Sequence, residues 1–499
     1  MPLSISPASP ANGRSRAALL KHIVPVLLVG LALRLFFLWR FPTVAGDSDI
    51  YEKLARNWID FVVYGLQIQG NLTPVDVRAP GYPGFLALVY LVVGPTRLAV
   101  RLVQAVLDLA SCLLIASLAA RVAAPHQAGT SPKTAMRAYL TALWLAALCP
   151  FTANYVAVVL SETLIVFLNT AALLLLVIAW QGDGAARWQE ISRSRWLAAG
   201  FVIGLGTLAR PETPLLLVGV ALVITPRCLK RGEWQKLLRI GILLAGGVLL
   251  PLLPWAARNW ITLGRVQFLS AHYAELSGEY VPHGFSDWTG TWLVRFRDVY
   301  LVSWKVEDQE IDVDDLPAYA FDSGAERDRV AALIDELNDD MGISPQLDVK
   351  FGELARERTR RHPLRTYLWV PLQRLATLWF TPRIELLPYS GRLWPLTEQY
   401  AEDPTDLSVT LGLAAANVVY LGWGLAGLWV WFRRRQAAAI AAIPSGVALL
   451  VIFVAVRALY FLQVDTPEPR YLLECFPVVI ALAAQAWAGF PGKPSTLPS

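Results

Sequence analysis

The chain has 499 residues, of which 55% are hydrophobic and only 17% are charged, and its mean hydropathy is +0.45. This composition excludes an ordinary soluble protein and predicts a polytopic membrane protein. The net charge of +5 is modest and its basic residues are spread over short loops, which argues against a nucleic-acid-binding surface. The four cysteines have no close pair, so neither a disulfide framework nor a zinc site is expected.

Long apolar segments recur along the chain, separated by short polar loops. A helix needs about 20 apolar residues to cross a bilayer. The expected spans are residues 22–40, 98–121, 138–153, 155–180, 196–209, 211–226, 240–257, 408–432, 439–462 and 471–490. The first is too long and too apolar for a signal peptide, and no small-residue cleavage site follows it. The sequence therefore predicts an all-α polytopic membrane protein with about ten transmembrane helices.

Basic residues give the predicted orientation of the spans. Lys and Arg are enriched in cytoplasmic loops, and here they precede the first span, occupy alternate loops and end one span at 433–435. Both tails, 1–21 and 491–499, are therefore predicted to be cytoplasmic. The loop that holds Asp47 is predicted to face outside.

Several predicted regions lie on the outer face. The first outer loop, 41–97, contains an amphipathic juxtamembrane helix that runs from Ser48 towards Gly65. Residues 364–382 are predicted to form an interfacial helix, because Arg374 interrupts them and the orientation of the next span does not allow a single crossing. The predicted domains are the transmembrane catalytic module 22–259, a small soluble outer insert with the interfacial helix at 260–407, and the C-terminal helices 408–490.

Ionisable residues gather at the outer ends of the predicted spans. Charges near the hydrocarbon are costly and are usually kept inside a bundle or cavity. A carboxylate among several arginines suits a substrate that carries phosphate, because guanidinium groups bind phosphate oxygens in a bidentate manner. The ionisable residues that share this side are Asp47, Asp49, Arg78, Glu162, Arg210, Glu212, Arg258, Glu468 and Arg470, and all of them except Glu212 are expected to form the site.

Most of these residues also have a purely structural interpretation. Asp47 could cap the helix expected to begin at Ser48, and Asp49 could favour the dipole of that helix. The other structural interpretations are an interfacial anchor for Arg258, a simple ion pair of Arg470 with Glu468, and an interhelical hydrogen bond for Glu162.

Four short stretches, by their order and spacing, carry a resemblance to a known family. They are GDSDIYEKLA at 46–55, RAPGYP at 78–83, LPWAARNWITLG at 253–264 and EPRYLL at 468–473. Together they resemble the GT-C superfamily of membrane glycosyltransferases, close to the family of protein O-mannosyltransferases and the aminoarabinose transferase of lipid A. The resemblance covers most of the chain and implies a GT-C-like fold.

The resemblance implies an inverting transfer of a sugar from a polyprenyl-phosphate donor to an acceptor hydroxyl, on the outer side of a bacterial cytoplasmic membrane. It implies that Asp47, in an Asp-x-x-x-Tyr pattern ending at Tyr51, is the catalytic base. The Glu that often follows this aspartate in the family is Ser48 here. Arg78 lies where relatives hold a basic residue that contacts the donor phosphate.

The other arginines are expected to add positive charge around that phosphate. They are Arg210, Arg258 and Arg470. Further expected substrate contacts are Asp49, Tyr51, Tyr82, Glu162, His272 and Glu468. No cofactor is expected, although a divalent metal is left open, as are the sugar (hexose or pentose) and the acceptor (lipid, glycan or protein).

A transporter or flippase of a lipid-linked sugar is the alternative function. In such a protein the same arginines would bind the head group without chemistry. Transporters commonly contain internal repeats and bind substrate near the membrane midplane. This sequence has no evident repeat and its polar residues gather at one membrane face, which favours the enzyme.

Overall fold

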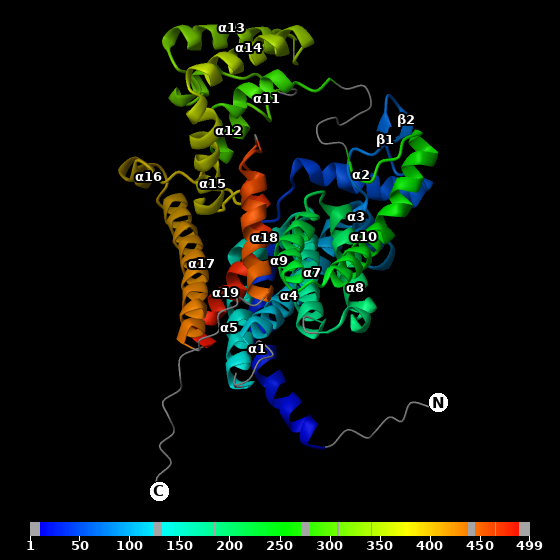
Figure 1. Ribbon diagram of the computed structural model, residues 1–499. Coiled ribbons are helices and arrows are strands. Elements are labelled where there is room, and N and C mark those ends of the chain that lie inside the picture. Colours follow the sequence, from blue (N-terminus) through cyan, green and yellow to red (C-terminus); the bar gives the residue numbers. More distant parts are fainter. Residues whose placement is uncertain are drawn as a thin grey trace.

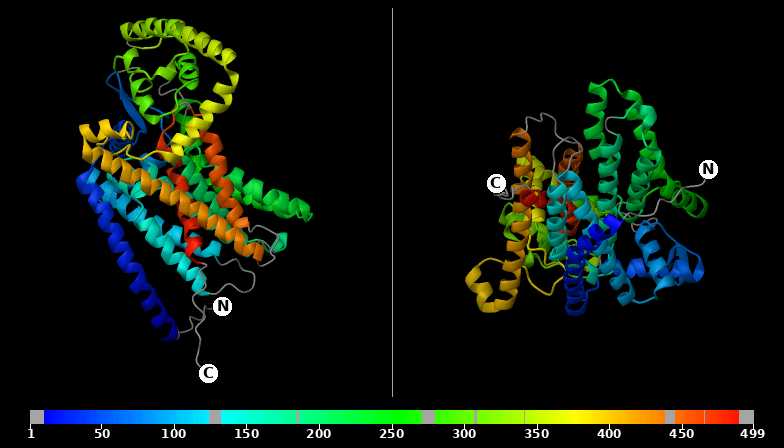
Figure 2. Two further views of the ribbon diagram at one scale, coloured as in Figure 1. Left: turned by 90° about the vertical axis from the view of Figure 1, so that its left-hand side faces the viewer. Right: turned by 90° about the horizontal axis from the view of Figure 1, so that it is seen from below.

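The computed structural model describes residues 10–123, 132–183, 186–270, 280–306, 309–340, 342–437, 445–464 and 466–488. These residues form a bundle of long helices with a smaller helical unit on one end, and the only sheet among them has two strands (Figure 1). Two further views show the bundle from the side and from below (Figure 2).

The bundle consists of helices that correspond one by one to the predicted spans. They are α1 (Pro10–Arg40), α4 (Arg97–Ala123), α5 (Pro132–Ala147), α7 (Glu162–Asp183), α8 (Arg193–Ala209), α9 (Leu215–Lys230), α10 (Trp234–Leu263), α17 (Pro404–Ala437), α18 (Ser445–Phe461) and α19 (Phe476–Ala488). A 3₁₀ segment, η6 (Pro469–Cys475), leads into α19, and a short one, η2 (Trp188–Glu190), precedes α8.

Six helical segments in the described ranges are long and apolar enough to cross a membrane. They are Leu20–Arg40, Arg97–Ala123, Glu162–Asp183, Trp234–Leu263, Pro404–Arg433 and Pro469–Ala488. The pair Lys133–Ala147 and Pro150–Ala157, bent by 45°, would make a seventh if it forms one span. α8, α9 and α18 are shorter, at 17, 16 and 17 residues. The protein is an all-α polytopic membrane protein, as the sequence predicted.

One predicted boundary is wrong. The apolar run from 138 to 180 was expected to break near residue 154, but α5 ends at Ala147 and α7 begins only at Glu162. The residues between them form the short helix α6 (Pro150–Asn154), the 3₁₀ turn η1 (Tyr155–Ala157) and an extended stretch. Proline lacks an N–H and is tolerated in the first helical turn, so Pro150 ends one helix and starts another. Glu162 is thereby placed at the start of a helix.

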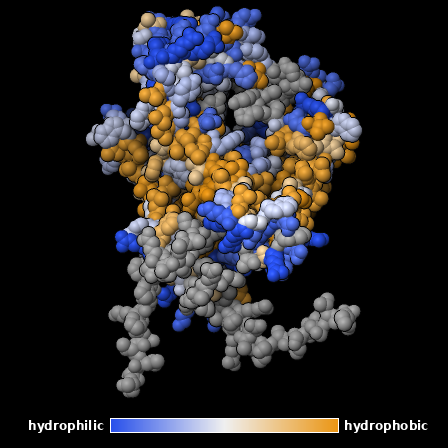
Figure 3. Space-filling model, viewed as in Figure 1, coloured by the Kyte–Doolittle hydropathy of each residue, from blue (hydrophilic) through white to orange (hydrophobic). Residues whose placement is uncertain are grey.

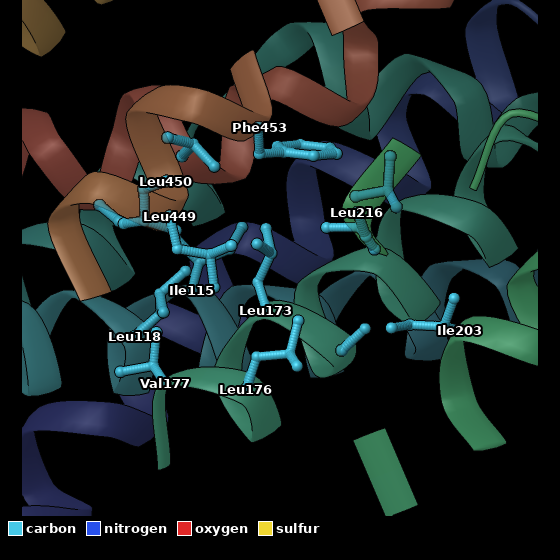
Figure 4. Packing of buried hydrophobic residues seen from close by; sticks show 14 of the residues in the cluster. Ile115, Leu118, Leu173, Leu176, Val177, Ile203, Leu216, Leu449, Leu450 and Phe453 are labelled. Atoms are coloured by element: carbon cyan, nitrogen blue, oxygen red, sulfur yellow. The ribbon is translucent and has the colours of Figure 1, made fainter. Parts of the chain in front are cut away.

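The interior of the bundle is a continuous apolar core. Figure 4 shows Ile115 and Leu118 of α4 packed near Leu173 of α7 and Phe453 of α18. Where α8 crosses α10 the backbones touch: a Cβ at Gly200 would lie 2.4 Å from the carbonyl oxygen of Leu244. Small residues allow this close packing in membrane bundles. Figure 3 shows the hydrophobic side chains as a band between two hydrophilic ends.

The first outer loop folds against one end of the bundle. It contains α2 (Gly46–Phe61), the hairpin of β1 (Gly65–Ile68) with β2 (Asn71–Pro74), and α3 (Gly81–Val92). The hairpin was not expected from the sequence. Its two turn residues, Gln69 and Gly70, have φ values of 49° and 82°, as the tight turns that suit twisted hairpins require.

The insert, which is predicted to lie outside, has a hydrophobic core of its own. Its elements are α11 (His283–Gly290), α12 (Phe296–Leu301), η3 (Val313–Asp315), η4 (Ala318–Ala320), α13 (Gly324–Asp340) and α14 (Pro345–Arg361). Trp288, Trp292 and Phe351 are among the buried residues at its centre. The π-helical turn η5 (Arg365–Trp369), α15 (Val370–Phe380) and α16 (Leu396–Glu402) connect the insert to α17.

The predicted interfacial segment 364–382 contains η5 and α15, and neither belongs to the spanning segments found in the described part of the chain. Arg374, which is buried, donates to the carbonyl oxygens of Leu293 and Gly290 in the insert, both at 2.6 Å. Tyr367 and Trp369 are exposed. α15 thus has a polar attachment to the insert and exposed aromatic side chains beside it, and its location at the membrane surface stays a prediction.

Exposed single cysteines can test this orientation without removing the native thiols, because all four native cysteines are buried. Cysteines at Gly342 and at Thr397 of α16 are expected to react with an impermeant maleimide added to intact cells. A cysteine at Arg231, at the opposite end of the bundle, serves as the control and is expected to react only after permeabilisation. Labelling of Thr397→Cys only after permeabilisation would contradict the predicted orientation.

Candidate functional site

Asp47 lies in the first turn of α2 and not at the cap position, so the alternative interpretation of Asp47 as a helix cap is wrong. The helix begins at Gly46, two residues earlier than the sequence suggested, so the residue before it, Ala45, occupies the cap position. The hydroxyl of Ser48 accepts a hydrogen bond from the backbone N–H of Ala45 at 3.2 Å. The Asp47 carboxylate is therefore available for contacts outside its own helix.

Two arginines from distant segments flank Asp47. Arg78 Nη2 donates to Asp47 Oδ1 at 3.0 Å, and Arg470 Nη1 lies 3.5 Å from Asp47 Oδ2. Burial alone would raise the pKa of Asp47, but the guanidinium groups of Arg470 and Arg78 outweigh burial and hold that pKa below its ordinary value. Asp47 is therefore a carboxylate at neutral pH.

The loop that carries Arg78 is held against the bundle by a close backbone contact. A Cβ at Gly81, in the RAPGYP stretch, would lie 2.4 Å from the carbonyl carbon of Leu208, near the end of α8. Only glycine allows this approach without displacing the backbone. The start of α3 therefore rests on the end of the helix that leads to Arg210.

Arg470 connects Asp47 to carboxylates deeper in the bundle. Its Nη1 lies 3.6 Å from Glu162 Oε1, and its Nε forms an ion pair with Glu468. Glu162, the first residue of α7, is also paired with Arg210. The expected pair of Arg470 with Glu468 is thus present, as one contact among several.

Arg210 extends the ion pairs into the interior. Its Nη1 donates to Glu212 Oε1 at 3.3 Å and its Nε to the hydroxyl of Ser161 at 3.3 Å. Glu212 Oε1 lies 3.9 Å from Nη2 of Arg457, an α18 residue that also pairs with Glu474. We call this set the ion-pair cluster: Asp47, Arg78, Glu162, Arg210, Glu212, Arg457, Glu468, Arg470 and Glu474.

Exposure falls along the ion-pair cluster. The side chains of Arg78 and Asp47 are 26% and 25% exposed, whereas those of Arg210 and Arg457 are 10% and 0% exposed. The cluster holds four arginines and five carboxyl groups, and burial raises the pKa of one of these, Glu468, against the effect of Arg470. Ligands from water can therefore reach the Asp47 end, while the Arg457 end is enclosed.

The structure does not bring Asp49 and Arg258 into the cluster. Asp49 pairs with Arg97 at 2.6 Å on the exposed side of α2. Arg258 Nη2 donates to the carbonyl oxygen of Tyr64 at 2.5 Å, and its guanidinium lies over the rings of Tyr64 and Trp255. Its donors are directed at the first outer loop, so the expected phosphate contact of Arg258 is not supported.

Tyr51 and Tyr82 lie beside the cluster and pack edge to face, with ring centroids 5.0 Å apart. Burial, and next the charge of Asp47, raise the pKa of Tyr51 to about 12. The hydroxyl of Tyr82 donates to Gln104 Oε1 at 2.7 Å, so its polar atom is already paired. His272 lies outside the described residues.

Sequence reasoning did not find Arg457 and Glu474 as members of the cluster. Both lie within apolar segments, where a charged residue is itself a signal of function. In the described ranges no three His, Cys, Asp or Glu side chains are grouped so that they could hold a metal ion.

Comparisons with known proteins give matches among solved structures only. No protein-family model and no curated protein matches the chain. Three matching structures are of the oligosaccharyltransferase from Archaeoglobus fulgidus. They are AglB in complex with an inhibitory peptide and a dolichol-phosphate (14% identity, TM-score 0.47, 94% of this chain and 50% of that chain), a complex with Zn and sulfate (14%, 0.45, 94% and 48%) and the apo form (14%, 0.46, 93% and 50%).

The chain therefore spans about half the length of the structures that it matches.

The exposure gradient predicts different stability effects for two arginines. Arg210→Met leaves the carboxylate of Glu162, 2% exposed, without its main partner, and breaking a buried pair in this way costs about 3–5 kcal/mol. Arg78→Met breaks a partly exposed pair, which is typically worth about 1 kcal/mol or less. Unfolding in detergent micelles measures both.

The double variant Glu162→Met/Arg210→Met is the control, since it leaves no unpaired charge between these two positions. It is expected to be more stable than Arg210→Met alone. Equal stability of Arg210→Met and Arg78→Met would contradict the division of the cluster into an enclosed and an accessible end.

Proposed function

We propose that the protein is a membrane glycosyltransferase that moves a hexose or pentose from a polyprenyl-phosphate donor to an acceptor hydroxyl, with inversion, at the outer face of a bacterial cytoplasmic membrane. The observation that carries this proposal is the Asp47 carboxylate held between Arg78 and Arg470 at the accessible end of the ion-pair cluster. The acceptor belongs to a lipid, a glycan or a protein.

Asp47 acts as the general base in this proposal. Its lowered pKa supports the role in one respect, because the group is ionised at neutral pH and can accept a proton. The acceptor oxygen attacks the anomeric carbon while its proton passes to Asp47. The bond between the anomeric carbon and the phosphate oxygen breaks, and its electron pair leaves with polyprenyl phosphate.

The arginines bind and stabilise that leaving group. Phosphate oxygens suit guanidinium groups, and Arg78 and Arg470 are the more exposed arginines of the cluster. A bound phosphate competes with Asp47 for these two cations. Asp47 then loses part of the attraction that lowers its pKa, so donor binding makes it a stronger base.

Arg210 has a different part in the proposal. Its guanidinium is paired with Glu162 and Glu212 and donates to Ser161. It therefore adds positive charge to the site without a direct contact to the donor phosphate. We therefore assign the direct phosphate contacts to Arg78 and Arg470 and keep Arg210 as a supporting charge.

Asp47→Asn is expected to lower kcat by about 10²- to 10⁴-fold, because asparagine cannot accept the proton. The protein should still fold, since asparagine keeps the shape of aspartate. Steady-state transfer of radiolabelled sugar from the lipid donor measures the effect.

The matched control is Asp49→Asn, two residues along the same helix, whose carboxylate pairs with Arg97 and is 56% exposed. It is expected to retain most of the activity. Near-normal turnover in Asp47→Asn would remove the base from the mechanism.

Arg78→Ala is expected to raise KM for the lipid donor by about 10- to 100-fold, because it removes charged hydrogen bonds worth about 1.5–3 kcal/mol. KM for the acceptor should change little. Lysine should restore the affinity only in part, since it lacks the bidentate geometry. Arg56→Ala, an exposed arginine of α2, is the control, and equal donor KM values for Arg78→Ala and Arg56→Ala would refute the phosphate contact.

The pH profile of kcat/KM reports the free enzyme. Because the pKa of Asp47 lies below its ordinary 3.8, the wild-type profile should show no loss of activity from Asp47 protonation between about pH 5 and 8. Arg78→Gln removes one cation that lowers this pKa, so burial raises it and the acid limb moves to higher pH. An identical profile in the variant would contradict the coupling of Asp47 to Arg78.

A further inference from the structure

A second polar group of side chains lies beside the ion-pair cluster and has no part in the mechanism above. The hydroxyl of Tyr155, in η1, donates to Glu385 Oε1 at 2.8 Å. Glu385 follows α15, and its chain segment is fixed to η6, because Arg383 Nη1 donates to the carbonyl oxygen of Pro469 at 3.0 Å. Glu385 is thus tied to the residue directly before Arg470.

Electrostatic contacts connect this group to the cluster. The charges of Glu385, Glu162 and Arg470 all act on the hydroxyl of Tyr155. Those of Glu468, Glu385 and Arg470 act on the hydroxyl of Tyr300, in α12 of the outer insert. Glu385 therefore lies between the bundle and the insert, next to the cations assigned to the donor phosphate.

Two carboxylate oxygens here need hydrogen-bond donors. Within the described ranges Glu385 Oε2 and Glu162 Oε2 are buried and have no hydrogen-bond partner. The whole Glu162 residue is also buried, with 1% of its surface exposed. A buried acceptor without a hydrogen-bond donor destabilises the protein. Carboxylates only accept, so a ligand that satisfies them must supply O–H or N–H groups, and it should not be an anion.

Tyr300, on which the charge of Glu385 acts, belongs to a pair of exposed aromatic rings. Tyr300 packs on Trp304 with ring centroids 4.3 Å apart, and both side chains are more than 40% exposed, at 44% and 46%. Exposed aromatic rings beside convergent polar atoms are typical of small-molecule sites. Apolar ring faces combined with acceptor-only carboxylates suit a ring that carries several hydroxyl groups.

We propose that Glu385, Tyr155 and Tyr300 form a subsite for a polyhydroxylated ring, in which the ring hydroxyls donate to the carboxylates of Glu385 and Glu162 and one ring face packs on Tyr300. This proposal rests on the proposed function for the neighbouring phosphate site. The ring belongs either to the lipid donor or to an acceptor that contains a sugar.

Binding to the full-length protein in detergent tests the subsite with three probes. They are undecaprenyl phosphate, undecaprenyl phosphate carrying glucose or arabinose, and the methyl glycosides of these sugars. The wild type is expected to bind one sugar-carrying lipid about tenfold more tightly than the bare lipid phosphate. Glu385→Gln and Tyr155→Phe should either abolish this difference or weaken the binding of a methyl glycoside, and both should leave the affinity for undecaprenyl phosphate unchanged.

Matched controls are Glu357→Gln, an exposed glutamate paired with Arg329, and Tyr319→Phe, whose hydroxyl bonds Asp298 within the insert. Both should keep the preference for the sugar-carrying lipid. Thermal unfolding checks that each variant is folded, and Tyr155→Phe decides the result if Glu385→Gln does not fold.

The outcomes separate the two sources of the ring. Loss of the preference in the variants means that the subsite holds the donor sugar. A retained preference with about tenfold weaker binding of a methyl glycoside means that it holds an acceptor sugar. If the variants keep both the preference for the sugar-carrying lipid and the wild-type affinity for the methyl glycoside, the subsite is refuted. Failure of the wild type to bind any of the lipids would refute the phosphate site instead, and the glycoside arm would still test the subsite.

Discussion

The need to pair charges shapes the end of the bundle that holds Asp47, and the pair of Asp47 with Arg470 links an early part of the chain to a late one. This pair joins α2 of the first outer loop to η6, and the two residues are 423 positions apart in the chain. Charges in a low-dielectric interior are tolerated only when they are paired. Asp47 and Arg470 therefore connect α2 to η6 through a partly exposed ion pair, and Asp47 does not occupy the cap position of its helix.

The same requirement organises the rest of the ion-pair cluster. Glu162 can stand at the buried start of α7 because Arg210 and Arg470 both face it, and Arg457 can lie inside α18 because Glu474 faces it. The enclosed part of the cluster holds the helix ends in register. The accessible part, around Asp47 and Arg78, exchanges its partners for a ligand at lower cost, so structure and proposed chemistry share one set of charges.

The sequence predicted those features that depend on local pattern and on the alternating direction of successive spans. Apolar length located the spanning helices, and their alternation placed Asp47, Arg78, Arg210 and Arg470 at one end of the bundle. Contacts that depend on the rotation of a helix about its axis were not predictable. Arg258 is the clearest case, because nothing local indicates that its side chain turns towards Tyr64.

Long-range pairing also explains what sequence reasoning missed. Arg457 and Glu474 lie in apolar segments, and their ion pair cannot be predicted without knowing that α18 and η6 face each other. Glu385 lies in an irregular segment whose position follows from the contact of Arg383 with Pro469. α2 begins earlier than its sequence pattern indicated, with Ala45 at the cap position and its N–H donating to the hydroxyl of Ser48.

The most direct test of the account is turnover by the purified protein in detergent micelles, where no second compartment exists. Undecaprenyl phosphate carrying a sugar is mixed with the protein and a membrane extract as the source of acceptor, and free undecaprenyl phosphate is quantified by mass spectrometry. A glycosyltransferase releases free undecaprenyl phosphate over many turnovers. If the donor binds but stays intact, while the protein moves it across the bilayer of a reconstituted vesicle, the cluster serves a transporter and the account is wrong.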